Sequence, residues 1–593
     1  MRAVSLVAPV YALTLTLAVT APLLAPGYLL LRDAVSTPRS YLSDSALGLS
    51  QAAPRALPQD YAVALASAVL DGGVVVKALL ILGLWLAGWG AARLAATVLT
   101  DAGVAGQCVA VTIAIWNPYV AERLLQGHWS LLVGYGCLPW VAATVLALRG
   151  HSGISAPELH STRQTANGLR VECNSGGMVC ALLFWIALAG LTPTGLLLAA
   201  AIALVSAVAP GDGRSRKFCA AVSLGAATAA ALPWLVASAV ATGWADQAAA
   251  ADESGVTAFA ARAEPGLGTL GSLASLGGIW NAEAVSASRT TLFALASAGV
   301  LLAVVAVGVP LLIRRRAAVP LVVVAAIAVV IPALMATGPG LAAVEALIRA
   351  VPGLGVLRDG QKWVALAVPG YALAGAATVV TLRPRVPAAA IAAVCCAAIV
   401  ATLPDLAWGV GGRVSPVQYP TGWPAAAAVI NADPRPVAVL PVDSMRSFAW
   451  AGDAPVLDPL PRWVRADVLS TGDLTLAGRT VPGEGVRARE VQRLLVSGAD
   501  RGQLAAAGVG WLVTEHGAGG SDFPRFALPV AYRDDDLTVY DVGGDSPGSP
   551  RRTLMLAAHT VWLGLLGGGL AGMLLFPFRR RPGQATHTAA TPR

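Results

Sequence analysis

Charge is what this 593-residue sequence has least of: only 12% of its residues are Asp, Glu, Lys or Arg, while 56% are hydrophobic. A soluble domain has about 25% charged residues, because water must wet its surface. The shortage of charge therefore excludes an ordinary water-soluble globule, and the high hydrophobicity excludes a disordered chain. We expect most of the surface to face a lipid bilayer.

Motifs with recognisable chemistry are also scarce. The seven cysteines form no CxxC pair and no cluster with histidine at the spacing of metal ligands, so the residues by themselves predict no metal site. Walker and dinucleotide-binding glycine patterns are absent, which argues against an ATP-driven pump and a Rossmann enzyme.

Long apolar runs, in contrast, are abundant. A helix needs about 20 largely apolar residues to cross the hydrocarbon core, and twelve segments approach that length: 4–30, 74–98, 103–116, 129–148, 177–192, 193–209, 218–242, 291–313, 318–337, 364–382, 386–404 and 553–577. The predicted fold is an α-helical polytopic membrane protein with about twelve transmembrane helices. We expect the first helix to be retained, because its apolar run is longer than the roughly 7–15 residues of the hydrophobic region of a signal peptide.

Basic residues indicate the orientation of these helices. Arginine clusters at 314–316 and 579–581 adjoin the ends of apolar segments, and such residues favour the cytoplasmic side of a membrane. A multi-pass protein of the plasma (inner) membrane with both termini in the cytoplasm is therefore predicted. The formal net charge of +8 then lies at the cytoplasmic rim. We interpret it as topological and predict no nucleic-acid partner.

Three divisions follow from this orientation. Residues 436–441 and 510–514 look like buried strands that follow helix-like stretches, and residues 530–542 look like a hairpin. These patterns predict an extracytoplasmic α/β or α+β domain that contains no cysteine. The predicted divisions are a transmembrane domain at 1–404 with outer loops 31–73, 116–129, 243–290 and 338–363, the extracytoplasmic domain at 405–552, and a last helix with a basic cytoplasmic tail at 553–593.

Ionisable groups near a bilayer are costly and often mark function, and here they gather in the predicted outer loops. Asp33 and Asp44 follow the first apolar segment. A carboxylate in this position can accept a proton from a hydroxyl group if its pKa suits the task. The alternative is that Arg32 and Asp33 are an ordinary ion pair at the membrane edge.

The loop 116–129 is dense in hydrogen-bonding groups, with Asn117, Tyr119, Glu122, Arg123 and His128 among them. Anchoring at the membrane interface accounts for its aromatic residues, but it does not account for so many donors and acceptors. We therefore predict that this loop is functional.

Arg358 and Lys362 precede the tenth apolar segment. The two cations are four residues apart and would share one face of a helix. Two cations beside a membrane suit a phosphate group. Contact with lipid headgroups is the alternative interpretation.

Three motifs carry a resemblance to a known family: Trp-Asn-Pro-Tyr…Glu-Arg…Gly-His-Trp at 116–129, Ala-Gly-Leu-Thr-Pro-Thr at 189–194, and Leu-Arg-Asp-Gly-Gln-Lys-Trp at 357–363. Together they resemble bacterial multi-spanning glycosyltransferases of the GT-C superfamily, and the chain is similar to the membrane region of actinobacterial cell-wall arabinofuranosyltransferases. The resemblance implies a GT-C-like fold. It also implies transfer of a sugar, arabinofuranose or mannose, from a polyprenyl-phosphate donor to a cell-envelope glycan or glycolipid on the outer face.

The resemblance also implies roles for the candidate residues. Asp33, or else Asp44, would be the catalytic base, and Glu122 a further catalytic residue. Substrate-binding roles fall to the remaining candidates, with the last two as ligands of the donor phosphate: Asn117, Tyr119, Arg123, His128, Arg358 and Lys362. The sequence departs from the family pattern at Asp359-Gly360, where relatives have Glu-Pro. The first loop has no pair of adjacent acids, so no cofactor is predicted, and a divalent metal stays open.

Two further hypotheses compete with the enzyme. A lipid or glycan flippase or exporter is expected to carry ionisable residues near mid-span and internal repeats, whereas this chain keeps its charges at the outer rim. A non-catalytic scaffold that binds glycan for a partner enzyme stays open, because Gly360 replaces the proline of the family pattern. Inverting displacement needs one base, which suits the scarcity of acids.

Overall fold

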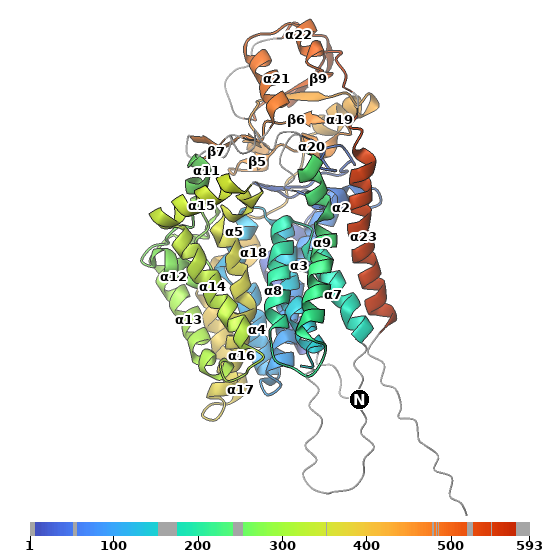
Figure 1. Ribbon diagram of the computed structural model, residues 1–593. Coiled ribbons are helices and arrows are strands. Elements are labelled where there is room, and N and C mark those ends of the chain that lie inside the picture. The colour runs from blue at the N-terminus through green and yellow to red at the C-terminus, as the bar shows by residue number, and fades with distance from the viewer. Residues whose placement is uncertain are drawn as a thin grey trace, which may run out of the picture.

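The computed structural model describes residues 6–50, 56–151, 175–240, 253–351, 353–476, 479–481, 483, 485–518, 526–546 and 548–576. The arginine cluster at 579–581 and residues 243–252 of the predicted third loop lie outside these ranges. Figure 1 shows a bundle of helices with a small mixed domain at one end. We call this end of the bundle the domain end.

Eight helices of the described chain are long and apolar enough to cross a membrane. Three of them combine two consecutive elements. The eight are α1 (Val7–Thr20) with η1 (Ala21–Leu24), α3 (Gly72–Val98), α4 (Gly103–Ile115) with α5 (Pro118–Leu125), α6 (Trp129–Leu148), α9 (Arg216–Val240), α13 (Phe293–Leu312), η5 (Gly360–Ala367) with α16 (Val368–Leu382), and α23 (Arg552–Leu575).

Each of the other four predicted spans also contains an apolar helix, but none reaches the required length alone. Two do so only together with a bent continuation: α14 (Val319–Met335) with α15 (Gly338–Ala350), bent by 94°, and α17 (Ala388–Ala401) with 404–411, bent by 75°. The count of twelve spans is therefore not confirmed: within the described residues eight helices are long enough to span, or up to ten if each bent pair is one span.

The remaining two helices, α7 (Ser175–Ala189) and α8 (Pro193–Ala207), are short. Fifteen residues of helix rise about 22 Å, less than the roughly 30 Å of a hydrocarbon core. Thr192 caps α8 and Pro193 occupies its first turn, so the chain restarts a helix at this point. The turn packs tightly on α6, where a Cβ added to Gly134 would lie 3.0 Å from the Cα atom of Gly195.

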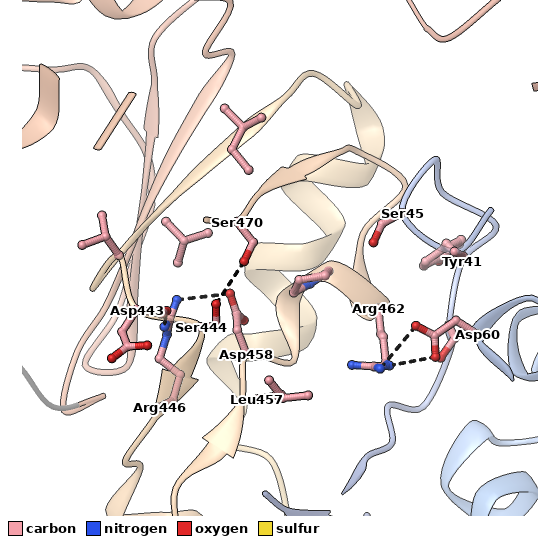
Figure 2. Close-up of a pocket in the computed structure, with 16 residues that line it drawn as sticks. Tyr41, Ser45, Asp60, Asp443, Ser444, Arg446, Leu457, Asp458, Arg462 and Ser470 are labelled. Atoms are coloured by element: carbon pink, nitrogen blue, oxygen red, sulfur yellow. Dashed lines mark hydrogen bonds and ion pairs between the residues drawn. The ribbon is translucent and has the colours of Figure 1, made fainter. Parts of the chain in front are cut away.

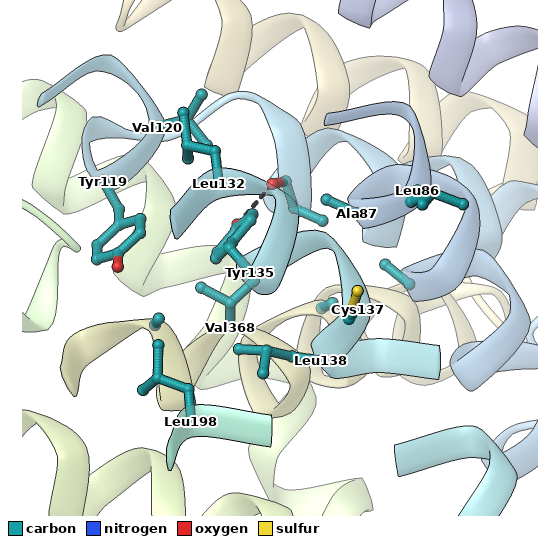
Figure 3. Packing of buried hydrophobic residues seen from close by; sticks show 14 of the residues in the cluster. Leu86, Ala87, Tyr119, Val120, Leu132, Tyr135, Cys137, Leu138, Leu198 and Val368 are labelled. Atoms are coloured by element: carbon teal, nitrogen blue, oxygen red, sulfur yellow. Dashed lines mark hydrogen bonds between the residues drawn. The ribbon is translucent and has the colours of Figure 1, made fainter. Parts of the chain in front are cut away.

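Small residues and stacked aromatic rings form the core of the bundle. A Cβ added to Gly136 of α6 would collide with the carbonyl of Gly83 in α3, so the two backbones lie in direct contact. Close approach at small residues is how helices associate in lipid. The rings of Tyr119 and Tyr135 stack with centroids 5.4 Å apart, among aliphatic side chains such as Val368 (Figure 3).

A five-stranded mixed sheet forms the centre of the C-terminal domain, in the order β10-β11-β9-β3-β6. β3 (Val437–Leu440) lies parallel to both β9 (Trp511–Glu515) and β6 (Val468–Leu469). All four residues of β3 are buried, as expected for a strand covered on both faces. The two strands predicted in the sequence are therefore present, with α19 (Gly422–Ala432) before β3 and α21 (Val486–Val496) and α22 (Arg501–Ala506) before β9.

The predicted hairpin is also present, as β10 (Val530–Arg533) paired antiparallel with β11 (Leu537–Asp541). The carboxylate of Asp534 accepts hydrogen bonds from the backbone N–H groups of Asp536 at 2.9 Å and Leu537 at 2.7 Å. Aspartate stabilises turns in this way.

The domain is joined to the bundle through a short ladder next to Asp33. The turn between β1 (Leu30–Leu31) and β2 (Ala34–Val35) contains Arg32 and Asp33. The amide of Arg32 donates to Pro455 at 3.0 Å, and Arg32 accepts from the amide of Leu457 in β5 (Val456–Leu457) at 2.9 Å. The domain therefore fixes the backbone of Arg32, the residue before Asp33.

Candidate functional site

Polar side chains from three of the predicted loops meet at the domain end of the bundle. The Asp33 cluster, as we call it, consists of Asp33, Arg123, His128, Asp359 and Lys362. A carboxylate oxygen of Asp33 lies 2.8 Å from Nε2 of His128, and an oxygen of Asp359 lies 2.8 Å from a terminal nitrogen of Arg123. The Lys362 ammonium lies 3.7 Å from Asp359. Four of the five residues are sequence-predicted candidates.

The backbone around α5 explains why these loops meet. The side chain of Asn117 caps α5 by accepting from the amide of Val120 at 3.0 Å, and Pro118 starts the helix. After α5, Gly127 adopts a positive φ of 79°, and a Cβ there would collide with the backbone of the β1–β2 turn. Glycine thus lets the Asp33 turn approach, and His128 follows directly.

Arg123 is the central connector of the cluster, and none of its side chain is exposed. One terminal nitrogen donates to Asp359 at 2.8 Å and to Nδ1 of His128 at 3.1 Å. The other donates to Asp359 at 3.1 Å and to the side-chain oxygen of Gln361. Each terminal nitrogen carries two N–H groups, so the protein itself occupies all of them. Arg123 therefore holds the loops together and has no terminal donor left for a substrate.

Glu122 lies beneath the cluster and is fully buried. Its carboxylate accepts from the amides of Gly278 at 3.0 Å and Ile279 at 3.1 Å, and from the side chain of Gln361 at 2.9 Å. These bonds fasten the predicted third loop to α5. Glu122 is thus placed as an anchor, away from any exposed surface.

The two predicted phosphate ligands do not share a helical face. Arg358 ends one 3-10 turn, η4 (Leu354–Leu357), and Lys362 belongs to the next, η5. Asp359 between them has non-helical backbone angles, because its side chain is drawn to Arg123. The Arg358 guanidinium lies over the ring of Phe259, with 5.2 Å to the centroid, whereas Lys362 is 25% exposed beside Asp359.

The charges in the cluster stabilise ionised carboxylates. Burial raises the pKa of Asp359, but the positive charges of Arg123 and then Lys362 lower it to about 2. Burial likewise raises the pKa of Asp33, and the hydrogen bond from His128 leads the effects that bring this pKa below its ordinary value, helped by Gln126 and the charge of Lys362. Asp33 is 39% exposed and therefore presents an ionised carboxylate to solvent.

The other predicted residues lie outside the exposed part of the cluster. Asp44 pairs with Arg552 at the start of α23 and accepts from the amide of Ser549 at 3.4 Å. Tyr119 is buried, and its hydroxyl donates to the carbonyl of Lys362 at 3.2 Å. Asn117 serves as the helix cap. Asp44 is thus separated from the predicted site, whereas Tyr119 and Asn117 support the site as buried residues.

Three residues of the site were not predicted as site residues. Gln126 donates to Asp33 at 3.2 Å, Asp359 pairs with Arg123, and Gln361 joins Arg123 to Glu122. Their signal in the sequence is the same for all three: each is a polar residue at the edge of a long apolar segment.

Within the described ranges, no three His, Cys, Asp or Glu side chains gather as ligands for a metal ion. Comparison with known protein families, curated proteins and solved structures finds no match for the chain. The cluster combines a partly exposed carboxylate that can accept a proton with a nearby cation that can stabilise negative charge.

Proposed function

We propose that this protein is a membrane glycosyltransferase. It transfers a sugar, arabinofuranose or mannose, from a polyprenyl-phosphate donor to a cell-envelope glycan or glycolipid on the outer face of the plasma membrane. One observation carries the proposal: the Asp33 carboxylate is partly exposed, ionised and close to Lys362, at the end of a bundle of membrane helices. Transfer from a lipid phosphate needs a base and a cation at the membrane surface.

The chemistry follows from these two groups. The acceptor hydroxyl attacks the anomeric carbon of the donor sugar and gives its proton to the carboxylate of Asp33. The bond between the anomeric carbon and the phosphate oxygen breaks, and the lipid phosphate leaves with the electron pair. Its additional negative charge develops near Lys362, where a positive charge stabilises it. One base and attack from the opposite face give inversion, and Asp33 then loses its proton to water.

Residues in the cluster and next to it act as positioning residues in this mechanism. His128 and Gln126 orient the Asp33 carboxylate at 2.8 Å and 3.2 Å. Arg123 and Glu122 hold the loops in place through their buried contacts. Arg358, whose guanidinium lies over the ring of Phe259, is proposed as a second cation for the donor phosphate.

The orientation of the chain is part of the proposal. The twelve apolar segments make up the membrane part of the bundle with an even number of crossings, so that both termini are cytoplasmic, and the C-terminal domain is extracytoplasmic. Cations at the end of the bundle opposite the domain support this orientation: Arg315 and Arg383 lie 3.1 Å and 3.6 Å from Asp101, and Arg149 donates to the carbonyl of Ala209 at 3.0 Å.

Transfer of labelled sugar in membranes tests the proposal. Wild-type protein supplied with polyprenyl-phospho-arabinofuranose or polyprenyl-phospho-mannose is expected to label an envelope glycan. Asp33→Asn is expected to lower kcat by about a hundredfold or more, the usual effect of losing a general base. Asp44→Asn, a matched change in the same loop, is expected to retain transfer, because Asp44 pairs with Arg552 outside the cluster. Arg358→Ala is expected to raise the KM for the donor.

Two outcomes contradict the proposal. Full transfer by the Asp33→Asn protein removes this residue as the base. Absence of transfer by wild-type protein with both donors contradicts the glycosyltransferase activity and favours a glycan-binding scaffold.

A further inference from the structure

A cavity of about 160 Å³ lies between the first loop and the C-terminal domain (Figure 2). The loop contributes Tyr41, Ser45 and Asp60 to its wall, and the domain contributes Asp443, Ser444 and Ser470 among others. No member of the Asp33 cluster lines it. One water occupies roughly 10–15 Å³ of such a cavity, so the cavity has room for a group the size of one sugar ring.

Ten of the sixteen residues that line the cavity are polar, and ion pairs and hydrogen bonds hold several of them in place. Arg462 of the domain pairs with Asp60 of the loop at 3.2 Å, and Arg446 pairs with Asp458 at 3.2 Å. The hydroxyls of Ser444 and Ser470 lie 3.3 Å apart. Figure 2 shows these side chains around one space, with the loop on one side and the domain on the other.

The balance of charge distinguishes between ligand classes. Three aspartates and two arginines line the cavity, and both arginines already form ion pairs with aspartates of the wall. An anion would meet an excess of negative charge. A neutral ligand rich in hydroxyl groups meets carboxylates that accept hydrogen bonds and serine hydroxyls that both donate and accept. The wall therefore suits an uncharged saccharide better than a phosphate.

The cavity is connected to Asp33 through one short strand. Leu457 lines the cavity, and its amide donates to the carbonyl of Arg32 at 2.9 Å. Arg32 precedes Asp33 in the chain. A ligand in the cavity is thus separated from the proposed base by the β5 strand and the β1–β2 turn.

We propose that this cavity binds one uncharged sugar residue of the acceptor glycan, at a distance from the hydroxyl group that receives the new sugar. The assignment to the acceptor rests on the proposed function. Binding of a saccharide in the cavity requires no catalysis and can be measured separately.

Saturation-transfer NMR on the full chain in lipid nanodiscs tests the proposal. The probes are methyl α-D-mannopyranoside, methyl α-D-arabinofuranoside and the linear trisaccharide of each sugar. Asp443→Asn removes a charged acceptor from the domain wall, and Ser45→Trp fills the cavity from the loop side. Asp453→Asn is the matched control, because Asp453 is exposed on the same domain and does not line the cavity.

Wild-type protein is expected to bind at least one probe, and inorganic phosphate is expected not to compete. Asp443→Asn and Ser45→Trp are each expected to raise the Kd about tenfold or more, the effect of losing one hydrogen bond to a charged group or the space itself. The control is expected to bind as wild type does. Thermal unfolding of each variant establishes that it is folded, and Asp443→Asn carries the test if Ser45→Trp does not fold.

Three results overturn the proposal: no probe binds to folded wild-type protein, binding is the same in Asp443→Asn and wild type, or phosphate displaces the saccharide. The proposed function fails separately. Asp33→Asn is expected to lose transfer and keep saccharide binding. If wild-type protein binds a saccharide in the cavity but transfers no sugar, the proposed saccharide site stands and the proposed glycosyltransferase activity is contradicted.

Discussion

His128 has only one hydrogen-bonding arrangement that its two neighbours permit. Arginine donates hydrogen bonds and cannot accept them, so Nδ1 of His128, 3.1 Å from Arg123, must accept. The proton of the neutral ring is then on Nε2, which donates to Asp33 at 2.8 Å. Burial lowers the pKa of His128 most strongly; the hydrogen bond to Asp33 opposes this effect, and the positive charge of Lys362 adds to it. His128 thus stays neutral and orients the carboxylate.

The pH dependence of transfer tests this arrangement at the residue scale. Asp33 must be ionised to act, and its pKa lies below the ordinary value, so the acid limb of kcat/KM is expected below the usual carboxyl range. His128→Phe and Lys362→Met each remove a group that stabilises the carboxylate. The pKa of Asp33 then rises, and the acid limb is expected to move to higher pH. Arg349→Met, an exposed cation on α15, is the control; an unmoved limb in both cluster variants contradicts the arrangement.

At the scale of elements, α5 connects two segments that lie far from it in the chain. Arg123 on this helix reaches Asp359, and its neighbour Glu122 reaches the amides of Gly278 and Ile279. Both side chains are fully buried. Removing one member of a buried ion pair leaves the other charge without compensation, which costs more than the pair contributes.

Thermal unfolding in detergent checks this role of α5. Arg123→Ala is expected to destabilise the protein by about 3 kcal/mol, because Asp359 stays buried with only the more distant Lys362 ammonium, at 3.7 Å, to compensate its charge. Arg123→Lys is expected to recover little, since a single ammonium cannot replace four N–H groups in a plane. The double variant Arg123→Met with Asp359→Asn is expected to be more stable than Arg123→Ala. Equal destabilisation by the double variant and Arg123→Ala contradicts the buried-charge explanation.

At the scale of the whole molecule, ion pairs and backbone pairing attach the C-terminal domain to the bundle. Asp60 in α2 (Gln59–Ala66) pairs with Arg462 of the domain, and Asp44 pairs with Arg552 at the start of α23. α23 runs down the side of the bundle from the domain (Figure 1). The domain, the first loop and the last helix therefore form one connected end of the protein.

Cysteine labelling in intact cells tests the proposed orientation of that end. The native cysteines are first replaced by alanine, and one cysteine is then introduced at an exposed position. Asp453→Cys in the domain is expected to react with a membrane-impermeant maleimide added outside the cell. Arg315→Cys, at the opposite end and 46% exposed in its side chain, is expected to react only after permeabilisation. The reverse pattern places the domain in the cytoplasm.

Short sequence patterns predicted the secondary-structure elements that depend on neighbouring residues alone. Apolar runs marked a helix in each of the twelve predicted segments but did not mark α5 or α15, which lie in predicted loops; the strands β3 and β9 and the hairpin at Asp534 were visible as short buried runs and a turn. Lengths and bends were predicted less well. The hydropathy of residues 338–350 does not show that α15 bends by 94° from α14, and the shortness of α7 and α8 follows from a cap and a proline between them.

The sequence by itself determined the solvent, a bilayer, and the loops in which polar chemistry gathers, because both depend on composition along short stretches. Only the tertiary structure decided the partners. Asp33 and Asp44 are equivalent as residues of one loop, but Asp33 meets His128 and Lys362, whereas Asp44 meets Arg552, 508 residues away. Packing of distant segments makes that choice, and it is the physical reason why one carboxylate is partly exposed beside His128 while the other fastens the fold.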